Sequence, residues 1–249
     1  MTVLVVGASG ATGRLLVAEL LRRGESVTAV VRSPGSLPDS LINQESLSVV
    51  QAPILEIDPD ELAEYVSGCR AIVSCLGHNL TFKGMYGSPR MLVTDATRRL
   101  CEAIRTCRPR DHVKFVLMNT AGNSNRDLDE PLSLGQRFAI GLIRLLVPPH
   151  RDNEQAAEYL RTSGSVNGEF IEWAVVRPDT LVDEDRATDY EVHPSPTRSA
   201  LFNAGKTSRV NVAHFMAELI TRDDTWRTWK ERMPVIYNKG FSEPGHMAT

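Results

Sequence analysis

Three glycines near the start of the chain, Gly7, Gly10 and Gly13, form the first pattern whose residue types and spacing could serve chemistry. They lie between an apolar run, Val3–Val6, and a segment, Ala11–Arg23, whose apolar residues recur at helical spacing. A glycine-rich turn between a strand and a helix leaves the first backbone N–H groups of the helix open to an anion. The pattern therefore predicts a site for the diphosphate bridge of a dinucleotide.

Each glycine has a distinct expected use in that turn. Gly7 allows the chain to reverse, Gly10 lets the diphosphate approach the backbone, and Gly13 lets the helix pack closely against the strand. The hydroxyl groups of Ser9 and Thr12 lie in the same turn and also favour an anion. A glycine-rich turn that binds no ligand is the structural alternative.

The end of the second expected strand indicates which dinucleotide binds. Arg32 stands there, about 20 residues after the glycine turn, where an NAD site carries Asp or Glu for the ribose 2′-hydroxyl. A guanidinium group suits the 2′-phosphate of NADP instead, and Ser33 adds a hydroxyl donor. We expect NADP(H) to be preferred over NAD(H); a solvated surface arginine is the alternative.

These residues need a scaffold of alternating strands and helices. Short apolar strands are expected at Val3–Val6, Ser26–Val31, Leu47–Gln51, Ala71–Cys75, Val113–Met118 and Ile171–Val176. Helices are expected at Ala11–Arg23, Pro59–Val66, Pro89–Thr106 and Asn153–Arg161. Strands that are apolar on both faces and alternate with helices predict an α/β fold, a Rossmann-like doubly wound parallel sheet with helices on both faces.

Composition sets the limits of this fold. The chain has 249 residues, 42% of them hydrophobic, which suits a single NAD(P)-binding domain over residues 1–249. We expect a cofactor-binding core at 1–180, a small C-terminal substrate-side lobe at 181–240 and a flexible tail at 241–249.

A net charge of −3 gives no electrostatic case for nucleic acid, and no apolar run is long enough to span a membrane. Four cysteines without a Cys-x-x-Cys pair and no visible secretion signal predict a cytoplasmic protein, and we expect no metal site.

Two segments depart from the alternation. An extra helix is expected at 134–147, where an α/β domain needs only a short connection, and the segment 183–205 is rich in Pro, Ser and charge and is expected to be irregular. The extra helix serves either as a wall or lid of a pocket or as the subunit contact of a homodimer. With the loop at 79–90, both segments would enclose a small-molecule electron acceptor.

Several stretches together resemble one known group. They are GASGATG at the first turn, the strand-end Arg32, SCLGHN after the fourth strand, WAVVRPDTL at the sixth, and SRVNVAHFMAELI later in the chain. From residue 3 to about 222, the chain resembles the atypical short-chain dehydrogenase/reductase proteins, the NmrA-like NAD(P)-binding branch that includes flavin/biliverdin reductase-type enzymes. The resemblance implies cofactor contacts from Gly7, Ser9, Gly10, Ala11, Thr12, Gly13, Arg32, Leu76, Gly77, Asn119, Thr120, Pro178, Thr180 and Leu181.

The catalytic pair of short-chain dehydrogenases, Tyr-x-x-x-Lys, is absent, because none of the five tyrosines has a lysine four positions later. The local pattern places His150 and Glu154 where the pair is expected, with Thr120 beside the nicotinamide. A carboxylate four residues after a histidine can share its helix face and favours the protonated ring as a proton donor. Otherwise His150 is an ordinary helix-start residue, and Asp152 and Gln155 resemble a capping pair.

The predicted function is an NADPH-dependent reductase that transfers hydride to an acceptor such as a flavin, quinone or conjugated tetrapyrrole. Such an acceptor can draw its proton from water, so activity does not require Tyr-x-x-x-Lys. His78, just past Gly77, is a second candidate near the nicotinamide. The alternative is a nonenzymatic NADP(H)-binding redox sensor whose loop conformation a partner reads. An epimerase or dehydratase fits less well, because those enzymes generally use Tyr-x-x-x-Lys too.

Overall fold

The computed structural model describes residues 2–33, 37–78, 87–128, 130, 147–162, 169–200 and 203–239. Its strands are β1 (Thr2–Val6), β2 (Ser26–Val31), β3 (Leu47–Gln51), β4 (Cys69–Ser74), β5 (Val113–Met118), β6 (Ile171–Pro178), β7 (Thr180–Val182), β8 (Tyr190–His193), β9 (Lys206–Ser208) and β10 (Val235–Asn238). Its helices are α1 (Ala11–Arg22), α2 (Asp39–Ile42), α3 (Pro59–Val66), α5 (Leu92–Cys107), α7 (Pro148–Thr162), α9 (Arg209–Thr221) and α10 (Asp223–Trp229).

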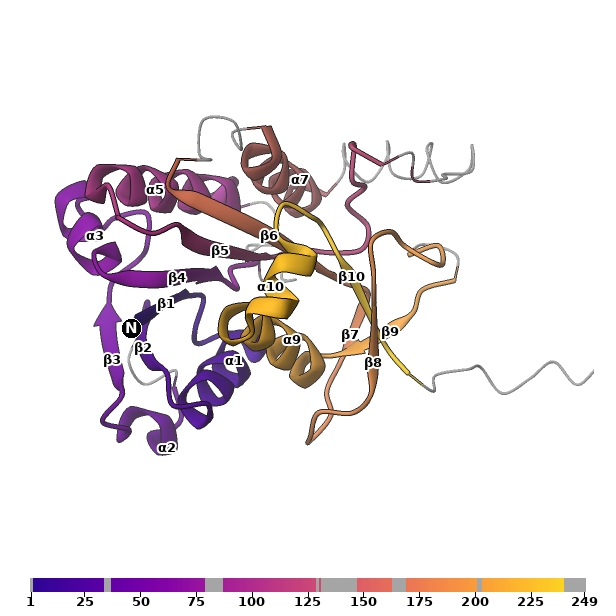
Figure 1. Ribbon diagram of the computed structural model, residues 1–249, viewed down its shortest axis with the longest axis horizontal. Coiled ribbons are helices and arrows are strands. Elements are labelled where there is room, and N and C mark those ends of the chain that lie inside the picture. The colour runs from indigo at the N-terminus through magenta and orange to yellow at the C-terminus, as the bar shows by residue number, and fades with distance from the viewer. Residues whose placement is uncertain are drawn as a thin grey trace, which may run out of the picture.

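The main sheet has eight strands in the order β3-β2-β1-β4-β5-β6-β10-β8, and all neighbours are parallel except β10 and β8 (Figure 1). Successive strands are added on one side of β1 as far as β3, and then on its other side from β4 onward. The order of the strands therefore reverses between β1 and β4. This is the doubly wound arrangement, and it confirms the expected fold class. Its topological switch point is the gap between the carboxyl ends of β1 and β4.

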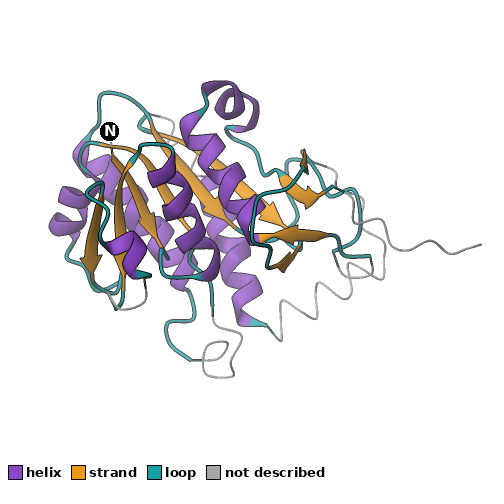
Figure 2. Ribbon diagram, turned by 90° about the horizontal axis from the view of Figure 1, so that it is seen from below, coloured by secondary structure: helices purple, strands orange, loops and turns teal. Residues whose placement is uncertain are grey.

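Helices cover both faces of the sheet (Figure 2). On β1, Val3 and Val5 pack into the core that α1 and α9 cover, whereas Leu4 and Val6 pack into the core that α3, α5 and α7 cover. Successive residues of a strand point to opposite faces, so a strand buried on both sides must be apolar throughout. That requirement explains the continuous Val-Leu-Val-Val run.

The structure also corrects parts of the sequence prediction. Helix α7 begins at Pro148, not at Asn153. The segment 183–205, expected to be irregular, contains β8, and β10 beyond it pairs with β6, so the range 181–240 adds two strands to the main sheet. Helix α9, from the same range, packs against α1 in the core. The expected helix at 134–147, apart from its last residue, and the tail at 241–249 lie outside the described residues.

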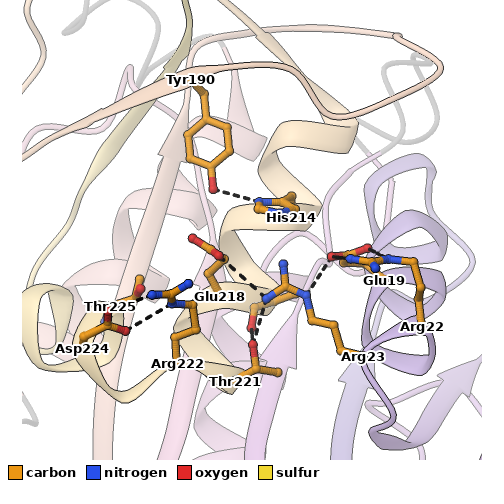
Figure 3. A network of polar contacts seen from close by, with 11 residues as sticks. Glu19, Arg22, Arg23, Tyr190, His214, Glu218, Thr221, Arg222, Asp224 and Thr225 are labelled. Carbon is orange, nitrogen blue, oxygen red and sulfur yellow. Dashed lines mark hydrogen bonds and ion pairs between the residues drawn. The ribbon is translucent and has the colours of Figure 1, made fainter.

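A polar network fixes the C-terminal end of α1 to α9 (Figure 3). The Arg23 guanidinium donates to Glu19 at 2.7 Å and to Thr221 Oγ1 at 2.8 Å. Farther along α9, the imidazole of His214 lies 2.9 Å from the Tyr190 hydroxyl of β8, and burial lowers the pKa of His214. Helix α1, whose N-terminus forms the glycine turn, is therefore anchored at its other end to α9.

Arg177 of β6 joins the sheet to the loops that follow β5 and precede β10. Its side chain is fully buried and donates to the backbone carbonyls of Met233 and Asn123, both at 2.7 Å. It also forms an ion pair with Glu130 at 2.8 Å, in which the two side chains are 0% and 5% exposed. A buried guanidinium with this many acceptors holds several segments in one arrangement.

We expect Arg177→Met to lower the free energy of unfolding by about 3–5 kcal/mol, because it leaves the Glu130 carboxylate buried without its cation. Chemical denaturation measures the loss. The matched control is Arg177→Met combined with Glu130→Leu, which removes both charges and should recover part of the stability. A double variant that is less stable than Arg177→Met would contradict this explanation.

Candidate functional site

The predicted cofactor residues gather at the carboxyl edge of the sheet. The glycine turn follows β1, Arg32 and Ser33 follow β2, Leu76 and Gly77 follow β4, and Asn119 and Thr120 follow β5. Ligands of open α/β sheets bind at this edge, at the switch point of the strand order. The fold therefore brings together residues that are up to about a hundred positions apart in sequence.

Two of the glycines are required by the protein's own backbone. Gly7 has a φ of +74°, and a Cβ there would lie 2.6 Å from the carbonyl carbon of Cys75 and 2.8 Å from the nitrogen of Leu76. A Cβ on Gly13 would overlap the carbonyl oxygen of Gly7. These contacts confirm the tight turn and the close helix packing that the sequence predicts, and all of them are made by the protein's own backbone.

Gly10 is different, because its surroundings are open. It is exposed and is the N-cap of α1, and a Cβ there would meet only the Gly7 oxygen, at 3.2 Å, among the described atoms. No side chain caps the helix, and its first turn carries no acidic residue. The backbone N–H groups of Ala11, Thr12 and Gly13 are thus without an intrahelical partner and suit a diphosphate. The turn fits the bridge of a dinucleotide.

The neighbouring strand ends place the remaining cofactor candidates. Val6 of β1 is level with Val30 of β2, so Arg32 lies beside the glycine turn with its side chain exposed. Across the switch point, Leu76 packs into the core and Gly77 is exposed. The glycine turn therefore has the exposed Arg32 on the side of β2 and the exposed backbone of Gly77 on the side of β4.

The side chains of Thr120 and His150 both border Gly122, in the loop that follows β5. The Thr120 hydroxyl and the His150 ring both lie within 4 Å of the position that a Cβ on Gly122 would take, at 3.7 and 3.6 Å. His150 Nε2 is 3.4 Å from Glu154 Oε1, and both side chains are nearly buried. This nitrogen makes no hydrogen bond to any described residue. The predicted catalytic trio of Thr120, His150 and Glu154 is therefore one cluster.

Asn119 has a structural contact in this cluster. Its side-chain amide donates to the Asn153 carbonyl of α7 at 2.8 Å, and its Oδ1 accepts from the Thr120 backbone at 2.9 Å. The residue fixes α7 to the end of β5. It thereby sets the distance between Thr120 and His150.

The third expected cofactor segment follows β6. Pro178 is buried, and its carbonyl accepts from the Ala121 backbone at 2.8 Å, which joins the ends of β5 and β6. Thr180 is exposed and Leu181 is half-buried, and both belong to β7, which pairs with β9. These residues border the site on the side of β6.

Asp152 has a role that the sequence did not reveal. It is not an N-cap of its own helix, because α7 starts four residues earlier, so the expected capping pair with Gln155 is wrong. Its buried carboxylate instead accepts from the backbone N–H groups of Val93 and Thr94, at 2.8 and 2.9 Å, in the first turn of α5. The same carboxylate lies 2.7 Å from His78 Nε2.

This carboxylate takes the place of a missing cap. The N-cap residue of α5, Met91, has no oxygen in its side chain and makes no capping hydrogen bond. Burial acts to raise the pKa of Asp152, but hydrogen bonds from His78, Thr94 and Val93 outweigh it and lower the pKa below the usual aspartate value. A single carboxylate therefore connects α7, the start of α5 and the residue that follows Gly77.

We expect the ionised Asp152 to stabilise the fold at neutral pH. Because its pKa is lower in the folded chain, this contribution is present above the ordinary aspartate pKa and disappears as the pH falls through the lowered value. Asp152→Asn should lower the free energy of unfolding at neutral pH by about 1–3 kcal/mol, since an amide has only one acceptor oxygen. Denaturation over a series of pH values measures both effects.

Asp95→Asn is the matched control, because that carboxylate is 45% exposed and is separated from the Arg98 guanidinium by 4.0 Å. It should change stability little. If Asp152→Asn has the same stability as the parent chain at neutral pH, the capping role is refuted.

Within the described ranges, no helix is long and apolar enough to cross a bilayer, and no His, Cys, Asp and Glu side chains cluster as metal ligands would. The four cysteines are free thiols.

A curated relative from Arabidopsis thaliana, an uncharacterized protein named as chloroplastic, is 28% identical over 224 residues, which cover 90% of this chain and 73% of the relative. The cytoplasmic location therefore stays a prediction.

Solved structures share the fold across nearly the whole chain. A short-chain dehydrogenase/reductase from Veillonella parvula in complex with NADP has a TM-score of 0.70 and 18% identity, covering 96% of this chain and 95% of that one. An oxidoreductase from Lactococcus lactis has a TM-score of 0.67 and 16% identity, covering 96% and 91%. Residues 7–223 match the sequence profile of the NAD(P)H-binding family. The resemblance found in the sequence is thus confirmed for family and fold, and the chain belongs to the NAD(P)H-binding family.

Proposed function

We propose that this protein is an NADP(H)-dependent reductase that passes hydride to a small-molecule electron acceptor. The observation that carries the proposal is the uncapped first turn of α1 at the switch point, with Arg32 beside it just after the end of β2. One similar structure, from Veillonella parvula, is a complex with NADP, and another, from Lactococcus lactis, is described as an oxidoreductase.

The coenzyme preference rests on Arg32. Its guanidinium is exposed beside the turn, and it offers paired N–H donors of the kind that bind a phosphate at two oxygens. Ser33 follows as a hydroxyl donor. No carboxylate for a ribose 2′-hydroxyl stands at the end of this strand.

Bound NADPH supplies the hydride. The residues of the chain orient the coenzyme, exclude water and supply a proton where the acceptor needs one. The buried His150 Nε2, without a hydrogen bond from the described residues, is the group available to donate that proton. Glu154 Oε1 lies 3.4 Å from this nitrogen, and the Thr120 hydroxyl and the His150 ring both border Gly122.

A second candidate function is that of a nonenzymatic NADP(H)-binding redox sensor. The missing Tyr-x-x-x-Lys pair favours it. In that case the nucleotide shifts the protein's conformation and a partner reads the change. The electron acceptor, and a homodimer through 134–147, likewise stay proposals.

We expect Arg32→Ala to weaken NADPH binding by about 10- to 150-fold, the effect of losing charge-assisted hydrogen bonds, and to leave NADH affinity nearly unchanged. Titration calorimetry with both coenzymes measures the difference. Arg32→Lys is the matched control, because it keeps the charge and loses only the bidentate geometry. Equal losses for the two coenzymes would exclude a contact between Arg32 and the 2′-phosphate.

The reductase proposal is tested by following NADPH oxidation with a panel of flavins, quinones and aldehydes. If His150 donates the proton, His150→Ala should slow turnover about 100-fold or more at unchanged NADPH affinity. His112→Ala, at the opposite edge of the sheet, should be as active as the parent chain. Tight NADPH binding without turnover of any acceptor would favour the sensor, and full activity of His150→Ala would return that residue to a structural role.

A further inference from the structure

A cavity of about 490 Å³ lies in the groove between the N-terminal halves of α5 and α7. The two helices pack side by side (Figure 1). Three arginines line the cavity from three separate elements: Arg90 from the turn before α5, Arg98 from α5 and Arg151 from α7. The other described residues of its lining are Met91, Asp95, Pro148 and Gln155.

Among the described residues, the positive charge of this cavity is largely uncompensated. Asp95 is the only carboxylate in the described part of its lining, and it is 4.0 Å from Arg98, at the outer limit of an ion pair. Arg90 and Arg151 are exposed and make no ion pair with the described residues. The chain as a whole has three more acidic than basic residues, so the cluster does not follow from a basic composition.

The arginines are also partly held in place. The Arg98 guanidinium stacks over the Tyr159 ring, 5.6 Å from its centroid. Arg151 stands next to Asp152, whose hydrogen bonds to α5 fix the distance between the two helices. A concave site with several guanidinium groups of one sign concentrates its field on an anion.

We propose that this cavity binds a small organic anion that carries phosphate or carboxylate groups. Guanidinium groups bind both at two oxygens, Gln155 adds an amide, and Met91 and Pro148 offer apolar contact to the body of the ligand. The volume suits a molecule of metabolite size. Nucleic acid is disfavoured by the net charge of −3.

Two sources of such an anion are consistent with this chemistry. One is the acidic arm of the acceptor itself, because Arg151 directly follows His150 in the chain; this source rests on the proposed function. The other is a separate anionic effector. Anion binding as such does not depend on reductase activity.

The test is a calorimetric titration of citrate into the full chain, with and without saturating NADPH, so that binding at the glycine turn is recognised. We expect citrate to bind in both cases, and Arg90→Gln combined with Arg151→Gln to weaken it at least about tenfold. Arg227→Gln combined with Arg232→Gln is the matched control, since it removes the same charge from exposed arginines elsewhere and should leave citrate binding unchanged.

Absence of citrate binding to the parent chain, or equal weakening in both double variants, would overturn the proposal. Circular dichroism of both variants shows whether they are folded. Since citrate binding needs no turnover, failure here is distinct from failure of the reductase proposal, which appears in NADPH affinity and oxidation.

Riboflavin and its 5′-phosphate distinguish the two sources, because they share one ring system and differ by a phosphate. If the arginines bind the arm of the acceptor, the phosphate form should have the lower KM, and this advantage should vanish in Arg90→Gln combined with Arg151→Gln. If a separate effector binds, citrate should leave the KM of both acceptors unchanged.

Discussion

The close approach of β1 to the chain beyond β4 is the constraint on which the site depends. At Gly7 the backbone passes so near Cys75 and Leu76 that no side chain fits, and α1 is pressed against the same turn at Gly13. With the N-terminal end of the helix placed this tightly at the switch point, its free N–H groups face the gap between the two halves of the sheet. The anion site is thus a consequence of how the strands and the helix pack. The network between Arg23 and Thr221 holds the other end of the same helix (Figure 3).

A second constraint acts between the helices on the other face. Helix α5 starts without a capping side chain of its own, and a carboxylate from α7 supplies the cap. A capping interaction of about 1 kcal/mol is usually local to one helix. Here Asp152 of α7 caps another helix, α5, so the stability of the first turn of α5 depends on the position of α7. The position of His78 depends on α7 in the same way, because its ring bonds to the same carboxylate.

The sequence predicted the parts of the structure that depend on local patterns. The strand–turn–helix at the glycines and the alternation up to residue 176 are of this kind, because burial on two faces requires apolar strands and periodic helices. The role of Asp152 was missed because its partners, Val93 and His78, are some 60 and 70 positions away. Strand β10 was missed because four residues carry little pattern, and its place beside β6 comes from tertiary pairing.

The first turn of α7 carries side chains that contact three places: the loop after β5, the arginine cavity and the start of α5. Consecutive side chains leave a helix about 100° apart, so His150, Arg151 and Asp152 point in three directions. His150 faces Thr120 at the end of β5, Arg151 faces the arginine cavity, and Asp152 faces α5 and His78. A rotation or shift of this one turn would therefore alter all three together. Because Asp152 binds α7 to α5 and Asn119 binds it to the end of β5, the turn has little freedom to move. An anion in the cavity would therefore act on a helix that already positions His150.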